Sequence, residues 1–378
     1  MLPDLPEPDQ QFLKQVTEFV DRKVIPAADA LDAAETYPES LVAMMKDIGF
    51  FSASTRSLTT YCLALEELAR GWLSLIPIAN AHTSSVWTLK HHGTERQKQK
   101  WLPRLLSGDL LACLGLTEPH AGSDLQAVTS TATRVGTDWS IRAQKTLITH
   151  SDHSDAMMIL VRTSPWSKGQ PGLSLFMLHR DEWEVKRRLP KLGSKGIETC
   201  EVSVNDIVIP GDRLVGGTAG HGFAQVMDAL EVGRLAVASA AVGVGRTALW
   251  NAVDYINRRE AFGGVVADMP AVQARIAEVA TALAAAKALT LGAAQAKERG
   301  GRRDLETSSA KVFASETAVK ASLVAMELAG GNGYLEELRF ARILRDAALF
   351  LAGEGANGVL NALIGTRIVR GEKDLTWI

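Results

Sequence analysis

The stretch SGDLLACLGLTEPHAGSDLQA, residues 107–127, marks the point where the pattern of the sequence changes. Before it, Thr94 and Gln97 form a capping box that opens a helical run over residues 95–106, and Ser107-Gly108 closes that run. After it, short segments rich in β-branched residues alternate with glycine, proline and aspartate. The change predicts a helical domain followed by a β domain.

The residues before this stretch show helical periodicity. Apolar side chains recur at helical spacing over residues 12–24, and Pro26 is expected to end that helix. Further helices are expected over residues 37–48 and 59–69, and residues 73–87 carry no ionisable side chain except His82. Such a segment is expected to be buried on most sides. We predict an all-helical N-terminal domain over residues 1–109.

The residues after it predict about seven strands without helices between them. A hairpin turn is expected at Gly136-Thr137-Asp138. These features predict a central antiparallel β-sandwich or barrel over residues 110–217. The expected strands cover residues 111–116, 128–135, 139–148, 157–163, 173–178, 183–189 and 200–209.

From Gly222 to the end the pattern is helical again. Residues 276–297 are rich in alanine, which suits close packing of long helices. We predict a C-terminal four-helix bundle over residues 218–378. The fold class is therefore α+β and multidomain, with helices, then an antiparallel β domain, then a helical bundle.

The composition is that of an ordinary soluble protein, with 46% hydrophobic and 22% charged residues. A formal net charge of -2 without a long basic block argues against nucleic acid or an anionic membrane as the main partner. The three cysteines, Cys62, Cys113 and Cys200, are far apart, so neither a disulfide framework nor a cysteine-rich metal site is expected. The longest nearly uncharged run, residues 235–245, is too short to span a bilayer. A cytoplasmic location is expected.

Glu354 is the candidate catalytic residue. It stands between Gly353 and Gly355, after an apolar run and before another helical pattern. Glycines on both sides let the backbone approach a ligand closely and leave the carboxylate free. The alternative is that the carboxylate of Glu354 caps the following helix.

Two motifs carry a resemblance to a known family. Residues 115–127, GLTEPHAGSDLQA, strongly resemble a signature of the acyl-CoA dehydrogenases. Residues 327–346, which include Gly330 and Gly331 and end at Asp346, resemble the second signature of that family, and Glu354 follows Asp346 by eight residues. Residues 259–263, REAFG, and 145–149, KTLIT, are similar to two further family motifs. The resemblance extends over about residues 18–365 and matches the three-part architecture.

The resemblance implies an enzyme that uses FAD to remove two hydrogens from the α and β carbons of an acyl thioester, converting acyl-CoA to trans-2-enoyl-CoA. Glu354 is the implied general base, and the hydride passes to flavin N5. The resemblance also implies residues that bind FAD, some of which reach the flavin of a neighbouring subunit. The implied FAD-binding residues are Leu116, Thr117, Gly122, Ser123, Ile148, Thr149, Arg259, Phe262, Glu327, Gly330 and Gly331.

The implied partners are acyl-CoA, an electron-transfer flavoprotein and further copies of the chain, as a dimer or as a homotetramer built from two dimers. Arg234 matches a family arginine near the phosphate end of the acyl carrier, although a solvated or salt-bridged helix arginine is an equal alternative. Some relatives place the base at the position of Gly233, which favours Glu354 here. The implied substrate-binding residues are Ser123, Glu231, Arg234, Gly353 and Gly355.

Five positions depart from the family pattern. Leu147 replaces the tryptophan that covers the flavin, Ala356 replaces a threonine, and Gly353 replaces an aromatic residue of the acyl pocket. Pro270 and Glu327 replace glutamines near the adenine end. The hypothesis from Gly353 is that extra volume beside the base admits a branched, cyclic or polar acyl group.

Alternative functions remain open on the same fold. The acyl group can be carried by an acyl carrier protein of a biosynthetic pathway instead of coenzyme A. Leu147 keeps open an oxygen-using flavin oxidase or monooxygenase. A relative that kept the fold and lost catalysis is a third class, against which the intact Glu354 argues. Residues 49–59 are shorter than in relatives, through either a deletion or an omitted loop.

Three other patterns are interpreted as structural. Residues 243–248 imitate a dinucleotide fingerprint but lie inside a helical pattern with no strand before them. His91 and His92 are expected to act as C-terminal helix caps. His150, Asp152, His153 and Asp155 are expected in a solvated loop, and we predict no metal site.

Overall fold

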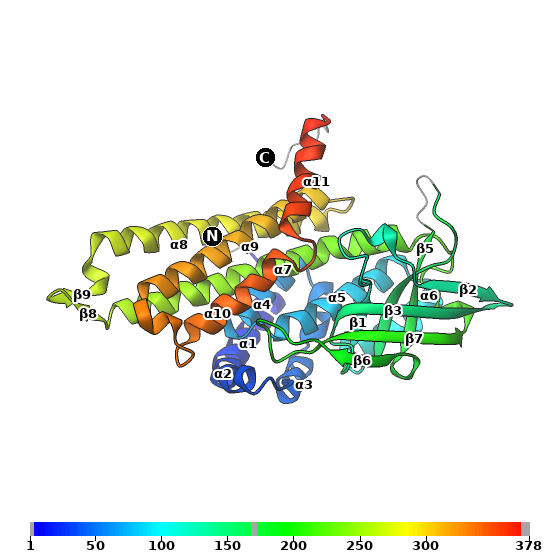
Figure 1. The fold of residues 1–378 in the computed structure, drawn as a ribbon, viewed down its shortest axis with the longest axis horizontal. Coiled ribbons are helices and arrows are strands. Elements are labelled where there is room, and N and C mark those ends of the chain that lie inside the picture. Colours follow the sequence, from blue (N-terminus) through cyan, green and yellow to red (C-terminus); the bar gives the residue numbers. More distant parts are fainter. Residues whose placement is uncertain (1–3, 168–171, 372–378) are drawn as a thin grey trace.

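The structure is a computed structural model that describes residues 4–167 and 172–371. N-terminal helices, a curled sheet and C-terminal helices follow one another along the chain (Figure 1). The predicted fold class is confirmed. The N-terminal helices are α1 (Glu7–Phe19), α2 (Ile25–Ala33), α3 (Glu39–Asp47), α4 (Leu58–Gly71), α5 (Leu75–His92) and α6 (Glu95–Ser107).

Pro26 does not end the first helical run, so that prediction was wrong. The chain passes from α1 through a π-helical turn, η1 (Val20–Val24), directly into α2, and Pro26 occupies its first turn. Proline lacks an N–H and clashes with the carbonyl four residues before it, and the wider π turn immediately upstream accommodates both effects.

The only ionisable side chain of the stretch 73–87, His82, links three elements. His82 is fully buried on α5; its Nε2 lies 2.9 Å from the carbonyl oxygen of Leu105 on α6, and its Nδ1 accepts from the N–H of Ala112. Burial lowers the pKa of His82 to about 4, so the ring is neutral, with Nε2 as the donor. The predicted capping box at Thr94 and Gln97 is present as well.

The sheet has seven strands in the order β1-β4-β2-β3-β7-β6, with β5 paired to β4. The hairpin at Gly136-Thr137 is confirmed, since Val135 of β2 pairs with Asp138 of β3. The sheet is mixed and not wholly antiparallel as predicted, because β1 runs parallel to β4. The β2–β3 hairpin between them returns the chain to the end of the sheet where β1 began. The strands are β1 (Ala112–Gly115), β2 (Thr131–Val135), β3 (Asp138–Thr149), β4 (Ala156–Arg162), β5 (Leu173–His179), β6 (Glu184–Arg188) and β7 (Thr199–Ile209).

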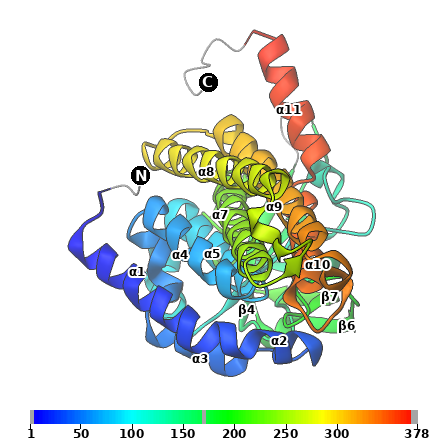
Figure 2. The same cartoon turned by 90° about the vertical axis from the view of Figure 1, so that its left-hand side faces the viewer.

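The C-terminal helices α7 to α10 pack together, and α11 projects away from them (Figures 1 and 2). Gly243 lies inside α7, where an added Cβ would meet the carbonyl oxygen of Glu66 at 2.2 Å. The glycines of residues 243–248 therefore serve close helix packing and not nucleotide binding. The elements are α7 (Gly222–Ile256), β8 (Glu260–Ala261), β9 (Gly264–Val265), α8 (Pro270–Glu298), α9 (Asp304–Leu328), α10 (Arg339–Ala348) and α11 (Asn357–Val369).

Short 3-10 turns connect these elements. The short region 49–59 contains the turn η2, whose residues Phe50 and Phe51 are buried in the N-terminal core. The domain limits 1–109, 110–217 and 218–378 stay predictions. The turns are η2 (Phe50–Thr55), η3 (Leu125–Ala127), η4 (Arg180–Glu182), η5 (Gly211–Arg213), η6 (Val266–Asp268), η7 (Gly330–Tyr334) and η8 (Leu349–Leu351).

One helix among the described residues, α8, is long and apolar enough to cross a membrane by length and composition alone. It packs against α7 and α9 in the bundle. A single helix of this kind is weak evidence for a membrane span, because bundle helices of other proteins meet the same criterion.

Asp346 of α10 joins the bundle to the sheet. Its Oδ1 accepts a hydrogen bond of 2.6 Å from the backbone N–H of Ser194, which lies between β6 and β7. The side chain of Asp346 is buried, and the guanidinium of Arg342 is 3.9 Å away. Burial raises the pKa of Asp346 to about 7, although Arg342 favours the ionised form.

We expect Asp346→Asn to remove part of the pH dependence of stability. The folded-state pKa of Asp346 lies above its unfolded value, so its contribution is full below about pH 4 and is lost as pH rises to about 7. Asparagine keeps the acceptor for Ser194 and cannot ionise. The free energy of unfolding of the wild type, relative to that of the variant, should fall by up to about 4 kcal/mol over this window. Chemical unfolding of both proteins from pH 4 to 8 measures it, and parallel pH curves would contradict it.

Candidate active site

Glu354 lies in the turn between η8 and α11. Its backbone adopts a left-handed conformation with φ of 53°, which is rare for a residue with a side chain, and Gly355 follows with φ of 101°. The N-cap position of α11 is Ala356, and no side chain caps this helix. The interpretation of Glu354 as a helix cap was therefore wrong, and its carboxylate points to other partners.

The carboxylate of Glu354 lies between α5 and α7. The side-chain amide of Asn80 on α5 donates a hydrogen bond of 2.7 Å to Oε1. On α7, a Cβ added to Gly233 would lie 2.5 Å from Oε2, so only glycine leaves room for the carboxylate there. Asn80 was not predicted as a site residue, although it stands in the buried segment around His82, where a polar amide needs a partner.

Two cations face the same carboxylate from the bundle. Burial raises the pKa of Glu354, and the hydrogen bond from Asn80 together with the charges of Arg234 and Lys311 opposes that rise. Lys311 on α9 donates to the carbonyl oxygen of Gly355 and to Oδ1 of Asn357, each at 2.7 Å, and so fixes the turn that carries Glu354. Burial lowers the pKa of Lys311 to about 8. The site therefore holds a carboxylate that can take up and release a proton.

Arg234 is buried on α7, and its Nε has no hydrogen-bond partner within the described residues. This N–H is therefore free to donate to a ligand, which favours a binding role for Arg234 over the salt-bridged alternative. Glu231, one turn earlier, is occupied: its Oε2 accepts from Nζ of Lys297 at 2.6 Å and from the backbone N–H of Arg303 at 3.0 Å. Of the two predicted substrate-binding side chains on α7, Arg234 is the more available.

Glu118 and Lys145 fix the signature loop that follows β1. The Glu118 carboxylate accepts hydrogen bonds from the backbone N–H groups of Thr129 and Ser130 and from Nζ of Lys145, the last at 2.8 Å. Lys145 also donates to the carbonyl oxygen of Leu116. Burial opposes ionisation of Glu118, yet Lys145 and these donors lower its pKa to about 2. Both residues lie within the motifs at 115–127 and 145–149, but no pattern in the sequence predicts their contact.

The loop and the end of β3 lie side by side. The backbone N–H of Thr146 donates to the carbonyl oxygen of Thr117 at 2.9 Å. The structure thus brings Leu116 and Thr117 together with Ile148 and Thr149, while Gly122 and Ser123 lie exposed on the same loop. Leu147 of β3 is 60% exposed with φ of 58°, and it lies where the pairing of β3 with β7 shifts between Lys145 and Ile148.

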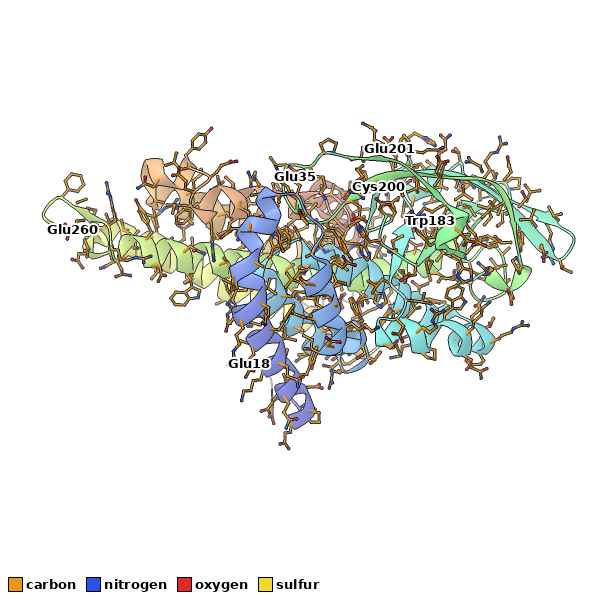
Figure 3. The ribbon with its side chains drawn as sticks, turned by 90° about the horizontal axis from the view of Figure 1, so that it is seen from below. Glu18, Glu35, Trp183, Cys200, Glu201 and Glu260 are labelled. Atoms are coloured by element: carbon orange, nitrogen blue, oxygen red, sulfur yellow. The ribbon has the colours of Figure 1, made fainter. Side chains whose placement is uncertain are left out.

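The remaining predicted FAD-binding residues lie at the other end of the molecule. Arg259 and Phe262 belong to the β8–β9 hairpin, and Phe262 is 97% exposed. Glu327, Gly330 and Gly331 are also exposed, and Arg275 on α8 links Glu327 to this end of the bundle. Figure 3 shows Glu260 of the hairpin far from Cys200 of β7 and from Trp183, which directly precedes β6. One chain therefore does not bring the two groups together.

His150 is buried, and the prediction of a solvated loop was wrong for it. Its Nε2 lies 2.8 Å from the hydroxyl of Tyr37 and its Nδ1 lies 3.0 Å from that of Ser154, so both ring nitrogens have partners. His153 is exposed and stacks on Tyr37. Within residues 4–167 and 172–371, no group of three or more His, Cys, Asp or Glu side chains is placed to hold a metal ion.

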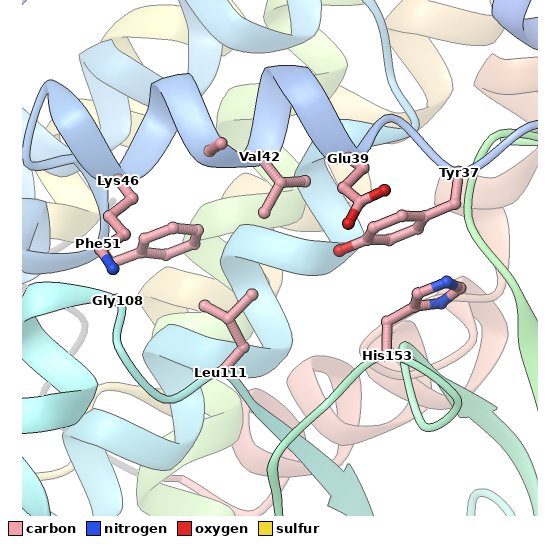
Figure 4. Close-up of a pocket in the computed structure, with 9 residues that line it drawn as sticks. Tyr37, Glu39, Val42, Lys46, Phe51, Gly108, Leu111 and His153 are labelled. Atoms are coloured by element: carbon pink, nitrogen blue, oxygen red, sulfur yellow. The ribbon is translucent and has the colours of Figure 1, made fainter.

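A cavity of about 260 Å³ lies beside the turn that carries His153, between α3 and the start of β1 (Figure 4). Tyr37 and His153 form one wall, and Phe51 and Leu111 lie at the other end. Lys46 at its edge is paired with Asp109. None of the predicted site residues lines this cavity.

Most of the chain is similar to known proteins. The N-terminal, middle and C-terminal domains of acyl-CoA dehydrogenases match residues 6–109, 113–207 and 220–369. An acyl-CoA dehydrogenase of Bacillus subtilis (strain 168) is 32% identical over 369 residues, covering 95% of this chain and 97% of that protein.

Solved structures agree over the whole fold. Butyryl-CoA dehydrogenase from Megasphaera elsdenii has a TM-score of 0.94 at 29% identity and covers 98% of this chain and 100% of its own. The prolyl acyl carrier protein oxidase AnaB has a TM-score of 0.91 at 27% identity, covering 97% of this chain and 100% of its own. The predicted enzyme class, an oxidoreductase, is confirmed. The chain belongs to the acyl-CoA dehydrogenase family.

Proposed function

We propose that this protein is an FAD-dependent dehydrogenase that converts an acyl-CoA to the trans-2-enoyl-CoA, with Glu354 as the general base. The observation that carries the proposal is the position of the Glu354 carboxylate, held by Asn80 against Gly233 and faced by Arg234 and Lys311. A buried carboxylate with a raised pKa is closer in acidity to the α C–H of a thioester than an exposed carboxylate is.

The turn around Glu354 also suits the developing enolate. The backbone N–H of Glu354 has no hydrogen-bond acceptor among the described residues. It is free to donate to the thioester carbonyl, on which negative charge develops when the α proton leaves. Lys311 holds this turn through the carbonyl oxygen of Gly355, so the carboxylate and the N–H of Glu354 are positioned together.

The protein is a flavoprotein of its family and uses FAD. Bound FAD supplies the hydride acceptor, flavin N5. The fixed loop fits this group, because a Cβ at Gly122 would have only one neighbour within 4 Å, Thr117 Cγ2 at 3.9 Å, so a ligand can approach the backbone there. Leu116, Thr117, Gly122, Ser123, Ile148 and Thr149 would line one FAD.

The second group of predicted FAD-binding residues, at the far end of the bundle, would bind the FAD of a neighbouring copy. Its exposure at the far end of the bundle, above all that of Phe262, supports this assignment. A dimer, or a tetramer of two dimers, then completes each site with Arg259, Phe262, Glu327, Gly330 and Gly331 from the partner. An electron-transfer flavoprotein would then accept the electrons from the reduced FAD.

Ser123, Glu231 and Arg234 would contact the arm that carries the acyl group, and Gly353 and Gly355 would border the acyl chain. The buried guanidinium of Arg234, with its unpaired Nε, supports a phosphate or carbonyl partner there. Coenzyme A and an acyl carrier protein present the same arm, so the carrier-protein thioester is the first alternative.

An oxygen-using oxidase is the second alternative. The exposed Leu147, at a position where relatives cover the flavin with tryptophan, favours access of oxygen. The similarity to AnaB, a protein named as a carrier-protein oxidase, supports the same alternative.

Anaerobic mixing of the FAD-loaded protein with acyl-CoA and acyl-carrier-protein thioesters tests the proposal through bleaching of the flavin absorption. Bleaching by acyl-CoA followed by slow reoxidation in air supports the dehydrogenase. Rapid reoxidation in air would overturn it in favour of the oxidase. Bleaching by carrier-protein thioesters alone would replace the acyl-CoA substrate, and no bleaching by any thioester would overturn the proposed reaction.

Gly233→Ala is expected to slow flavin reduction by about 10²-fold, because the new Cβ displaces the carboxylate from the reacting carbon. That Cβ would lie 2.5 Å from Oε2 and 2.7 Å from Cδ of Glu354. The crowding costs about 1–3 kcal/mol and the higher helix propensity of alanine offsets about 1 kcal/mol of it, so the melting temperature of the variant is measured beside the rate. Gly292→Ala on α8, where a Cβ meets nothing within 4 Å, is the matched control. Equal rates for wild type and Gly233→Ala would contradict the placement of Glu354.

A further inference from the structure

Asn80 has one free hydrogen-bonding atom beside the base. The residue is 7% exposed, and its Nδ2 donates to Oε1 of Glu354 at 2.7 Å. Only the NH2 of an amide can donate to an ionised carboxylate, so Oδ1 faces away from that oxygen. Within the described residues, Oδ1 of Asn80 is buried and has no hydrogen-bond partner.

A second unpaired polar atom lies one helical turn away. Ser84 follows Asn80 by four residues on α5, and residues at this spacing share one face of a helix. The Oγ of Ser84 is also buried without a partner in the part of the chain that the structure describes. Leaving a buried polar atom unpaired costs about 1–3 kcal/mol. Two such atoms one helical turn apart, on a face where Asn80 already bonds to Glu354, indicate a missing polar ligand.

The surroundings define the charge and the space available to that ligand. Gly233 and Gly353 border Glu354 without side chains, and a Cβ at Gly353 would meet only the carbonyl oxygen of Leu349 at 3.5 Å. Arg234 and Lys311 already place two cations near Glu354. A further cation would be repelled by both, whereas a neutral donor pairs with Oδ1 without that cost.

We infer that this site takes acyl thioesters whose acyl chain carries a neutral hydrogen-bond donor, such as a hydroxyl group, beyond the β carbon, and that Oδ1 of Asn80 accepts from it. The inference rests on the proposed function and specifies its substrate class. In the proposed function the carboxylate of Glu354 contacts the α carbon of the acyl chain. Oδ1 belongs to the same amide group whose Nδ2 bonds to Oε1 of Glu354, so it lies a short distance beyond the base. A donor that reaches Oδ1 is therefore expected on the γ or δ carbon. Asn80 is then both a positioning residue for the base and a specificity residue.

The test compares matched thioesters in anaerobic stopped-flow measurements of flavin reduction. The probes are butanoyl-CoA with 4-hydroxybutanoyl-CoA, and pentanoyl-CoA with 5-hydroxypentanoyl-CoA. We expect one hydroxylated member to react with an apparent second-order rate constant at least about 10-fold above that of its partner, the effect of one hydrogen bond of ordinary strength.

Asn80→Leu separates the two roles of Asn80. Loss of the donor to Glu354 should slow every thioester, whereas loss of Oδ1 should bring the hydroxylated-to-plain ratio to about 1. Ser85→Ala is the matched control on α5, because the hydroxyl of Ser85 is bonded to the carbonyl oxygen of Ala81. That variant should keep the wild-type ratio. A ratio that survives in Asn80→Leu would overturn the assignment to Asn80.

Calorimetric binding to the Glu354→Gln variant provides a readout without turnover. We expect the hydroxylated thioester to bind more tightly than its plain partner, and Asn80→Leu in the same background to remove the difference. Equal rates and equal binding for both members of each pair would overturn the inference while leaving the dehydrogenase proposal intact. Absence of bleaching by all four thioesters, with bleaching by other acyl thioesters, would overturn this inference alone. Absence of bleaching by every acyl thioester would overturn the proposed function, and with it this inference.

Discussion

Glu354→Gln is expected to lower the rate of thioester-dependent flavin reduction by about 10³-fold, within the range typical for loss of a general base. Glutamine has nearly the same shape, and its oxygen can still accept from Nδ2 of Asn80, so the turn and the pocket should be preserved. What is lost is the ability to take up the α proton. The substrate should still bind, which separates a chemical defect from a structural one.

Anaerobic stopped-flow absorbance at the flavin band measures this effect, with FAD content and melting temperature determined for each protein. Glu337→Gln, at an exposed glutamate before α10, is the matched control and should react like the wild type. Reduction of Glu354→Gln at a rate within 10-fold of the wild-type rate would place the base elsewhere.

The rate of flavin reduction is also expected to depend on pH, through Glu354 and Lys311. Glu354 must be ionised to act as a base, so the rate should rise as pH increases through its raised pKa. Lys311, with a pKa of about 8, loses its charge above that pH, and one cation that favours the ionised form of Glu354 then disappears. The two groups face each other, so the profile describes the pair and not either residue alone.

Local patterns in the sequence predicted the elements well, because strand alternation, capping and glycine turns are encoded by neighbouring residues. The capping box at Thr94 and the hairpin at Gly136 are examples. The interruption at Pro26 was misjudged, since a π turn compensates for the missing N–H in a way that apolar spacing does not reveal. The parallel pairing of β1 with β4 was missed for a related reason, because strand order depends on contacts between distant segments.

The candidate site shows the same difference between what local patterns predict and what contacts of distant segments decide. Glu354 could be proposed from its motif, but the contact with Asn80 joins residues 274 positions apart, and no periodicity encodes it. The buried state of His150 depends likewise on Tyr37, 113 positions away. The predicted FAD-binding residues fall into two groups at opposite ends of one chain, a geometry that appears only when the helices of the bundle are placed (Figure 1). Motifs therefore indicated which residues matter, and packing decided which of them meet.

Lys145→Met is expected to lower the free energy of unfolding by about 3–5 kcal/mol, the range found when one partner of a buried ion pair is removed. The side chains of Lys145 and Glu118 are 0% and 1% exposed, so the remaining carboxylate would be left as a buried, unpaired charge. Glu118 anchors the backbone at Thr129 and Ser130, and Lys145 anchors it at Leu116. The signature loop should therefore loosen, and FAD should bind more weakly.

Two comparisons distinguish this effect from a general sensitivity of the sheet to lost charge. Lys186→Met removes one partner of an exposed pair with Glu184 on β6 and should cost less than about 1 kcal/mol. The double variant Glu118→Gln, Lys145→Met leaves no charge buried. Its single amide oxygen still accepts from the backbone N–H of Thr129 or of Ser130, which in the wild type bond to different carboxylate oxygens. The stability and FAD affinity of the double variant should therefore exceed those of Lys145→Met alone, measured by chemical unfolding and by flavin fluorescence titration at pH 7. If the double variant were less stable than the single one, the cost would arise from lost packing and not from an isolated buried charge.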